Sequence, residues 1–68
     1  MIVYWVMTGK GCEIKRGWCH KGDITDMMRA VEYQVGLVRS ELFKLNAHVR
    51  FWTPQTGETY TDYQYAHD

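Results

Sequence analysis

The longest regular pattern in the sequence lies between Ile24 and Asn46, where apolar side chains recur at alternating intervals of three and four residues. This spacing lines up apolar side chains along one side of an α-helix, so we predict a single helix over the whole segment. Asp23 is placed to cap its first turn, because an aspartate side chain accepts hydrogen bonds from the free amide groups at the start of a helix. The residues of the apolar repeat are Met28, Val31, Val35, Val38, Leu42 and Leu45.

Two pairs of strand-like segments flank the predicted helix. Each segment is rich in β-branched or aromatic residues, or alternates apolar with polar residues, as strands do. Glycine-containing turns, Gly9-Lys10-Gly11 and Pro54-Gln55-Thr56-Gly57, separate the members of each pair and predict two hairpins. The four segments are Ile2 to Thr8, Cys12 to His20, Ala47 to Thr53 and Glu58 to Ala66.

The element order ββαββ indicates a single α+β domain, residues 1–68, with two layers: a four-stranded sheet and one long helix packed on one of its faces. The first strand is apolar on both faces, as a central strand is. The second strand carries Lys15 and the fourth carries Asp62, and charged residues are typical of sheet edges. We therefore predict an antiparallel sheet with the strand order 2-1-3-4.

A chain of this size buries only about 60% of its surface on folding, so we expect it to need stabilisation beyond its own core. Disulfides, metal ions and oligomerisation are the usual means. Cys12 and Cys19 are seven residues apart, which on one extended strand separates them by roughly 23 Å, too far for a disulfide or a shared metal ion. Only a bend near Gly17 would bring them together, so oligomerisation is the favoured means.

Gly36 stands in the middle of the predicted helix, where a glycine costs about 1 kcal/mol relative to alanine. Ser40 follows four residues later, and two small residues at that spacing allow a second helix to approach closely. The predicted helix spans roughly 33 Å and strands of about seven or eight residues span about 25 Å, so the helix would overhang the sheet. We predict a homodimer with an interface of Tyr33, Gly36, Ser40 and Phe43. The alternative is that Gly36 is merely tolerated and the two aromatic residues are ordinary surface residues.

The chain carries eight basic and eight acidic residues, and this balance removes the long-range positive field on which nonspecific nucleic-acid binding depends. The apolar opening from Met1 to Met7 is too short for a membrane span or for the core of a signal peptide, and no positive charge precedes it. Together with cysteines that are expected to be unpaired, these features predict a cytoplasmic protein with no membrane partner.

The sequence contains no complete catalytic, cofactor or metal motif. Gly17 and Gly22 precede the predicted helix as in a phosphate-binding loop, but Asp23 and Ile24 stand where that loop needs lysine and then serine or threonine. The cysteine and histidine residues do not have the spacing of a metal finger, and nothing supplies the third group that orients a catalytic Cys–His pair. We therefore predict no enzymatic activity, no cofactor and no bound metal.

The sheet face away from the predicted helix is expected to carry aromatic and basic residues. We predict that Arg50, Trp52, Tyr63 and Tyr65 bind a partner, because Trp, Tyr and Arg dominate the energetics of protein interfaces. The predicted function is that of a small protein-binding module, an inhibitor or adaptor of the kind that phages and other mobile elements encode. The same residue types stack bases and hold phosphates, so binding of RNA or single-stranded DNA is the alternative. A third possibility is an ordinary solvated face stabilised by cross-strand pairs.

Overall fold

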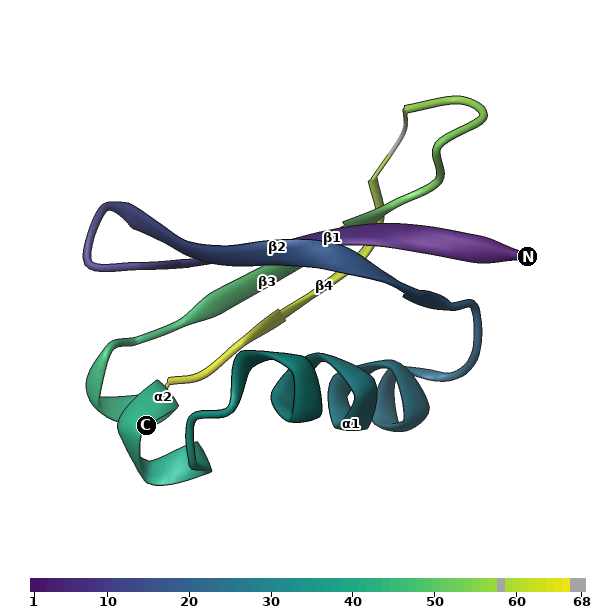
Figure 1. Ribbon diagram of the computed structural model, residues 1–68. Helices are drawn as coiled ribbons and strands as arrows, with labels where there is room; N and C mark the ends of the chain where they lie inside the picture. The colour runs from purple at the N-terminus through teal and green to yellow at the C-terminus, as the bar shows by residue number, and fades with distance from the viewer. Residues whose placement is uncertain (58, 67–68) are drawn as a thin grey trace.

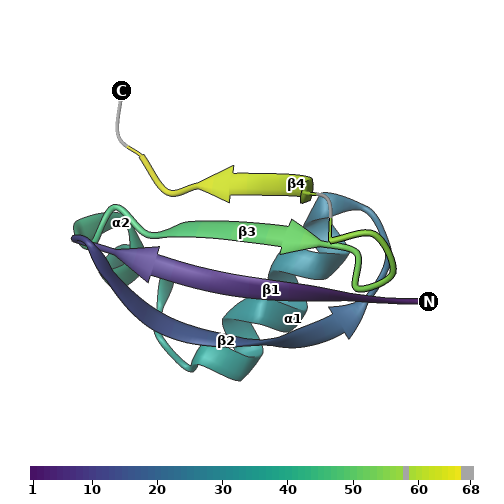
Figure 2. The ribbon, with the colours of Figure 1, turned by 90° about the horizontal axis from the view of Figure 1, so that it is seen from above.

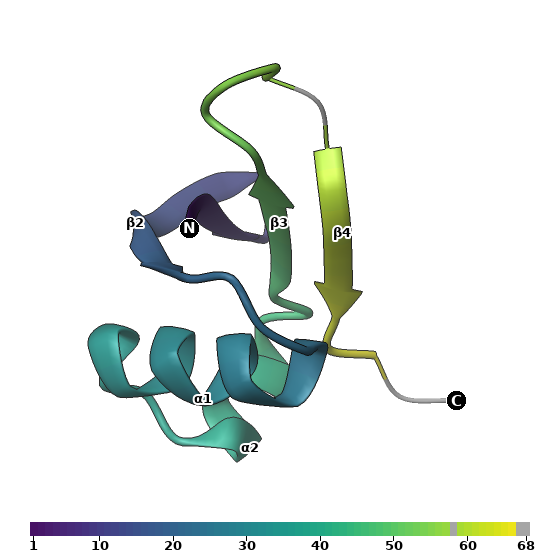
Figure 3. The same ribbon diagram turned by 90° about the vertical axis from the view of Figure 1, so that its right-hand side faces the viewer.

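The computed structural model describes residues 1–57 and 59–66, within which the chain forms four strands and two helices. Both helices lie on the same side of the sheet (Figures 1 and 3). Glu58, the predicted first residue of the last strand, lies outside the described residues. The elements in chain order are β1 Ile2–Gly9, β2 Cys12–His20, α1 Ile24–Val35, α2 Arg39–Lys44, β3 His48–Trp52 and β4 Thr59–Gln64.

The strands form one antiparallel sheet in the order β2-β1-β3-β4. This arrangement confirms the predicted α+β fold class and the predicted strand order. Strands β1 and β3 are central, and β2 and β4 form the edges, as Figure 2 shows from above the sheet. Lys15 on β2 and Asp62 on β4 are exposed, in agreement with their interpretation as markers of edge strands.

The two faces of the sheet separate clearly along β1. Val3, Trp5 and Met7 are fully buried in the core, whereas Tyr4 between them is exposed. Trp5 lies opposite Gly17 of β2. A Cβ at Gly17 would stand 3.1 Å from Cζ2 of Trp5, so the glycine makes room for the largest side chain of the core. The other buried core residues are Cys19, Met27, Met28, Val31, Leu42, Ala47, Val49, Phe51 and Tyr65.

Helix α1 begins at the predicted residue, and its last turn is held against β2. The side chain of Asp23 accepts a hydrogen bond of 2.9 Å from the amide of Asp26 and so caps the first turn. At the other end, Nε2 of Gln34 donates to the carbonyl of Trp18 at 3.1 Å, and Nζ of Lys15 donates to the carbonyl of Gln34 at 3.0 Å. These bonds fix the helix over the β2 side of the sheet.

The predicted single helix from Ile24 to Asn46 is wrong, because the chain breaks at Gly36. Gly36 caps the C-terminus of α1 in the left-handed conformation with φ 78°, and its amide donates to the carbonyl of Glu32 at 3.0 Å. A Cβ on Gly36 would meet nothing within 4 Å, so no close neighbour requires a glycine there. The requirement is conformational, since residues with a Cβ pay roughly 1–2 kcal/mol for the left-handed helical conformation.

The break also removes the overhang on which the homodimer prediction depended. After Val38, whose backbone is extended, the short helix α2 turns back and places Leu42 in the core. Tyr33 is 90% exposed on α1, while Phe43 belongs to α2 and packs edge-to-face on Tyr65 with ring centroids 5.3 Å apart. The predicted interface residues Tyr33, Gly36, Ser40 and Phe43 therefore do not share one continuous helix. Homodimerisation stays a prediction, to be tested by light scattering.

Both cysteines are free. Cys19 is buried in the core, and burial raises the pKa of its thiol, whereas Cys12 is exposed at the start of β2. Over the described part of the chain, neither helix has the length and apolar character needed to cross a membrane.

Candidate functional site

The side of the sheet that faces away from both helices is here called the open face (Figure 2). Its residues follow from the register of the strands, because directly paired residues of neighbouring strands point to the same face. On β1 they are Ile2, Tyr4, Val6 and Thr8, which alternate with the buried residues of that strand. Among the exposed aromatic side chains of the sheet, Tyr4 and Trp18 lie on the open face.

Three aromatic side chains form a row across neighbouring strands of the open face. Tyr4 of β1 pairs directly with Trp18 of β2 on one side and with Trp52 of β3 on the other. The rings of Tyr4 and Trp52 meet edge-to-face with centroids 5.9 Å apart. Tyr4 is 39% exposed and Trp18 is 52% exposed, so this aromatic row is open to solvent.

Arg16 of β2 and Arg50 of β3 form a second row, here called the arginine row, on either side of Val6 of β1. On each strand it lies two residues from the aromatic row. Val6 of β1 pairs with Arg16 on one side and with Arg50 on the other, and Arg50 in turn pairs with Asp62 of β4. The Arg50 guanidinium lies 5.5 Å from the ring centre of Trp52, a cation–π contact that connects the two rows.

Both arginines also have acidic neighbours. Arg16 donates two hydrogen bonds to the carboxylate of Glu13, of 2.5 and 3.0 Å, and these bonds lower the pKa of Glu13. On the other side of the face, Asp62 lies 3.2 Å from Nε2 of His48. The arginine row is therefore locally balanced by carboxylates and does not present a strong net positive charge.

A shallow groove of about 300 Å³ runs along the aromatic row. Trp18, Tyr4 and Trp52 line it, and Arg16 lines it as well. Gly17 and the buried Trp5 complete the lining. A groove with aromatic walls and a guanidinium at its rim suits a ligand that has flat apolar groups and a negative charge.

The structure brings two of the four predicted partner-binding residues to this face. Arg50 and Trp52 lie on it, as expected. The expectation that Tyr63 and Tyr65 accompany them is wrong, because Tyr63 pairs with the buried Val49 and therefore points to the helix side, and Tyr65 is 0% exposed. Because Arg50 pairs with Asp62 and His48 pairs with Gln64, these two residues of β4 lie on the open face. Tyr63 lies between them in the strand and therefore points to the opposite face.

Sequence reasoning missed Tyr4 and Trp18 as members of the site. The available signal was the combination of the predicted strand order with strict alternation, which places every second residue of the central first strand on the open face. By itself, the two-sided apolar character of Ile2 to Thr8 indicates a central strand but does not mark Tyr4 as a binding residue.

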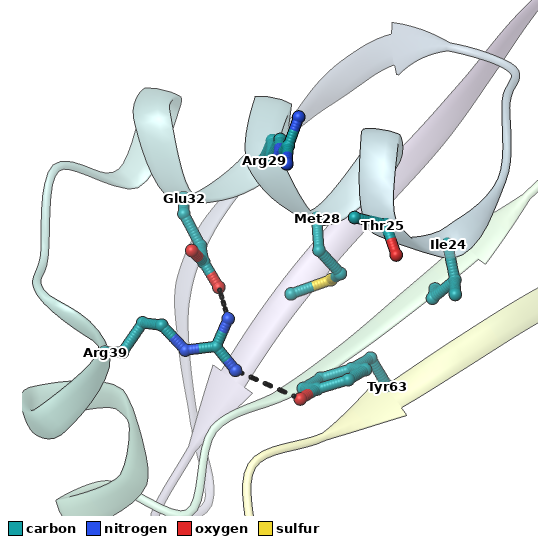
Figure 4. Close-up of a pocket in the computed structure, with 7 residues that line it drawn as sticks. All are labelled: Ile24, Thr25, Met28, Arg29, Glu32, Arg39 and Tyr63. Atoms are coloured by element: carbon teal, nitrogen blue, oxygen red, sulfur yellow. Dashed lines mark hydrogen bonds and ion pairs between the residues drawn. The ribbon is translucent and has the colours of Figure 1, made fainter.

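A second depression, of about 290 Å³, lies on the helix side between α1, α2 and β4 (Figure 4). There Nη1 of Arg39 stands 3.5 Å from the Glu32 carboxylate, and Nη2 donates to the hydroxyl of Tyr63 at 3.3 Å. Glu32 also accepts a hydrogen bond from the hydroxyl of Tyr65, and burial together with this bond raises the pKa of Tyr65. These polar groups satisfy one another, so their arrangement indicates a structural role.

The described residues do not assemble three or more His, Cys, Asp or Glu side chains at a position where a metal ion would be held. Comparison of the chain with protein families, with curated proteins and with solved structures found no match. The open face with its aromatic row, arginine row and groove is thus defined by its own geometry, and it is the candidate binding surface of the molecule.

Proposed function

We propose that this protein is a small, non-enzymatic binding module that recognises another protein through the open face of its sheet. The observation that carries the proposal is the aromatic row of Trp18, Tyr4 and Trp52, which lines a groove beside Arg16 and Arg50. Trp, Tyr and Arg are the residues that most often dominate the binding energy of protein interfaces. Such a module acts by occupying a surface of its partner, as an inhibitor or an adaptor does.

The balance of charge favours a protein partner over a nucleic acid. Binding to a phosphate backbone draws most of its affinity from neutralising phosphates with unpaired Lys and Arg side chains. Here Arg16 is bonded to Glu13, Arg50 lies opposite Asp62 in the sheet register while the Asp62 carboxylate contacts His48, and the whole chain has a formal net charge of +0. A protein interface does not need an excess of positive charge, because aromatic burial supplies most of its energy.

Binding of RNA or single-stranded DNA is the second candidate function, and the aromatic row is the observation that favours it. Rings on the open face of a sheet stack unpaired bases, and each stacked base contributes about 1–3 kcal/mol. The two functions differ in their dependence on salt, since binding to phosphates weakens steeply as ionic strength rises.

Affinity capture with the tagged full chain tests the proposal. The extract of the cells that encode the chain is divided, and half is treated with nuclease before capture. We expect a protein that the wild type retains with or without nuclease and that the variant Trp18→Ala loses. Tyr33→Ala is the matched control, because Tyr33 is an exposed aromatic residue on α1, away from the open face.

Two outcomes would contradict the proposal. One is retention that nuclease abolishes, which would favour the nucleic-acid function. The other is a partner that survives Trp18→Ala but is lost with Tyr33→Ala, which would move the binding surface to the helix side. Far-ultraviolet circular dichroism of both variants verifies that each is folded.

A further inference from the structure

We infer that the groove along the aromatic row binds a proline-rich segment in the polyproline II conformation, with an acidic residue between its prolines. This inference rests on the proposed function and names the kind of protein segment that the open face recognises. Three features of the open face lead to it: the spacing of the strands that carry the aromatic row, the pairing of the central strands and the position of the arginine row.

The spacing of the aromatic row matches one turn of a polyproline II helix. Neighbouring strands lie about 4.8 Å apart, so the backbones of Trp18 and Trp52, on the two strands that flank β1, are about 9.6 Å apart. A polyproline II helix rises about 3.1 Å per residue and repeats every three residues, so prolines at positions i and i+3 are about 9.3 Å apart. An extended β-strand presents side chains on one face about every 6.8 Å and does not match.

The backbone pairing of the sheet excludes a ligand that binds by strand addition at this place. Tyr4 lies on β1, which is paired with β2 on one side and with β3 on the other. Its peptide groups are therefore already engaged in the sheet. A polyproline II segment needs no such pairing, since its backbone has no internal hydrogen bonds and stays solvated, and proline has no amide hydrogen to satisfy.

The aromatic walls suit proline chemically. Proline-rich segments dock in grooves lined by aromatic residues, where the compact pyrrolidine ring packs against Trp and Tyr. They also lose little conformational entropy, because the free segment already adopts the bound conformation. Trp18 and Trp52 would each receive one proline, with the intervening residues passing over Tyr4.

The arginine row supplies the preference for an acidic residue. It runs parallel to the aromatic row, about 6.8 Å along the strands. The Arg16–Glu13 pair is exposed, with side chains 66% and 42% accessible. Glu13 accepts only two hydrogen bonds from Arg16, and a guanidinium has about five N–H donors, so one carboxylate of the ligand can bind beside Glu13 without displacing it. Because a polyproline II helix has three faces, a residue between the two prolines points away from the aromatic row and can reach the arginine row.

Nuclear magnetic resonance of the three tryptophan indole N–H groups tests the inference with the full chain. The probe is the capped peptide Pro-Pro-Glu-Leu-Pro-Pro, and the reference peptide has alanine in place of every proline. We expect the indole signals of Trp18 and Trp52 to shift saturably with the proline peptide. The backbone N–H signal of Tyr33, which lies on α1 away from the open face, serves as an internal control.

Substitutions in the protein and in the peptide show which contacts bind the proline peptide. Trp18→Ala is expected to weaken the proline peptide about tenfold or more, as removal of an interface hot spot does. Tyr33→Ala is expected to leave its affinity unchanged. Replacing the glutamate of the peptide by glutamine should weaken binding to the wild type several-fold and should have less effect when Arg16 is replaced by glutamine.

Failure of the inference is distinguishable from failure of the proposed function. Equal binding of the alanine peptide at Trp18 and Trp52 would overturn the proline-rich ligand and leave the protein-binding function in place. Absence of any saturable shift with the proline peptide at millimolar concentration would also overturn it. Shifts of these signals with a uridine oligonucleotide and with neither peptide would overturn both the inference and the proposed function.

Discussion

The hydroxyl of Tyr65 donates a hydrogen bond to the carboxylate of Glu32, a residue 33 positions earlier in the chain. This bond ties the segment that follows β4 to helix α1 on the side of the sheet opposite the open face. Arg39 of α2 joins the same carboxylate at 3.5 Å, so three separate elements meet at Glu32. The aromatic ring of Tyr65 is buried between Phe43 and Tyr63, with ring centroids 5.3 and 4.9 Å away.

Replacing Tyr65 with phenylalanine should lower the free energy of unfolding by about 1.5–3 kcal/mol, the usual contribution of a hydrogen bond to a charged group. The ring contacts with Phe43 and Tyr63 are kept, so the loss reports on the hydroxyl. Urea unfolding followed by circular dichroism measures it. Tyr60→Phe is the matched control, because Tyr60 is 43% exposed, and we expect it to change the stability little. Equal stabilities of wild type and Tyr65→Phe would contradict a role for the bond.

The same hydroxyl makes the stability depend on pH in the alkaline range. The pKa of Tyr65 is raised above its ordinary value of 10.0 by burial and by the bond to Glu32, so the unfolded chain loses this proton before the folded chain does. The contribution of Tyr65 to the free energy of unfolding is therefore at its full value below about pH 10 and declines as the pH rises above it. We expect the stability difference between wild type and Tyr65→Phe to shrink between pH 8 and pH 11 in urea unfolding. A difference that grows over this range would show the opposite sign.

Gly36→Ala distinguishes the observed helix break from a continuous helix by the sign of its effect. In a continuous helix, alanine would stabilise the protein by about 1 kcal/mol relative to glycine. At the left-handed C-cap with φ 78°, we expect a loss of about 1 kcal/mol instead, because a Cβ is unfavourable in that conformation. Urea unfolding measures the change, and Gly36→Asn should lose less, because asparagine tolerates the left-handed region better than alanine. A stabilised Gly36→Ala variant would indicate that the helix is continuous.

Gly17→Ala should destabilise the core by about 1–3 kcal/mol through overpacking. The added Cβ would stand 3.1 Å from Cζ2 of the buried Trp5 and 2.9 Å from Oε1 of Gln34. The Gln34 side chain can move only by giving up its bond to the Trp18 carbonyl. Gly22→Ala is the control, because its Cβ would meet Asp26 at an ordinary 3.5 Å. Thermal unfolding compares the two variants, and similar losses in both would argue against a specific packing role of Gly17.

The sequence predicted the sheet better than the helix layer. The strand order followed from charges on the edge strands and from the two-sided apolar character of the first strand. Both features are visible within a single strand, because edge strands are exposed to water and central strands are buried. The helix was predicted as continuous because the apolar repeat carries on through Val35, Val38 and Leu42. Hydrophobic periodicity carries no information on the backbone conformation of Gly36, and its left-handed conformation ends α1 there.

The candidate site was only half predictable for a similar reason. Arg50 and Trp52 were assigned to the open face because they alternate with buried residues in one strand. The side on which Tyr63 and Tyr65 lie depends on the register between β3 and β4, which includes an irregularity between Phe51 and Trp52. A shift of one residue in that register moves every side chain of β4 to the other face, and the sequence of the turn does not determine it.

The direction of the aromatic row has a consequence for how specificity can change. Each of its three rings is carried by a different strand, and the positions of the strands are fixed by backbone pairing that does not involve the ring itself. Exchanging one ring therefore alters one contact with a ligand and leaves the framework intact. Related chains with the same framework are free to acquire different preferences one position at a time, and a designer can retune this small scaffold in the same stepwise manner.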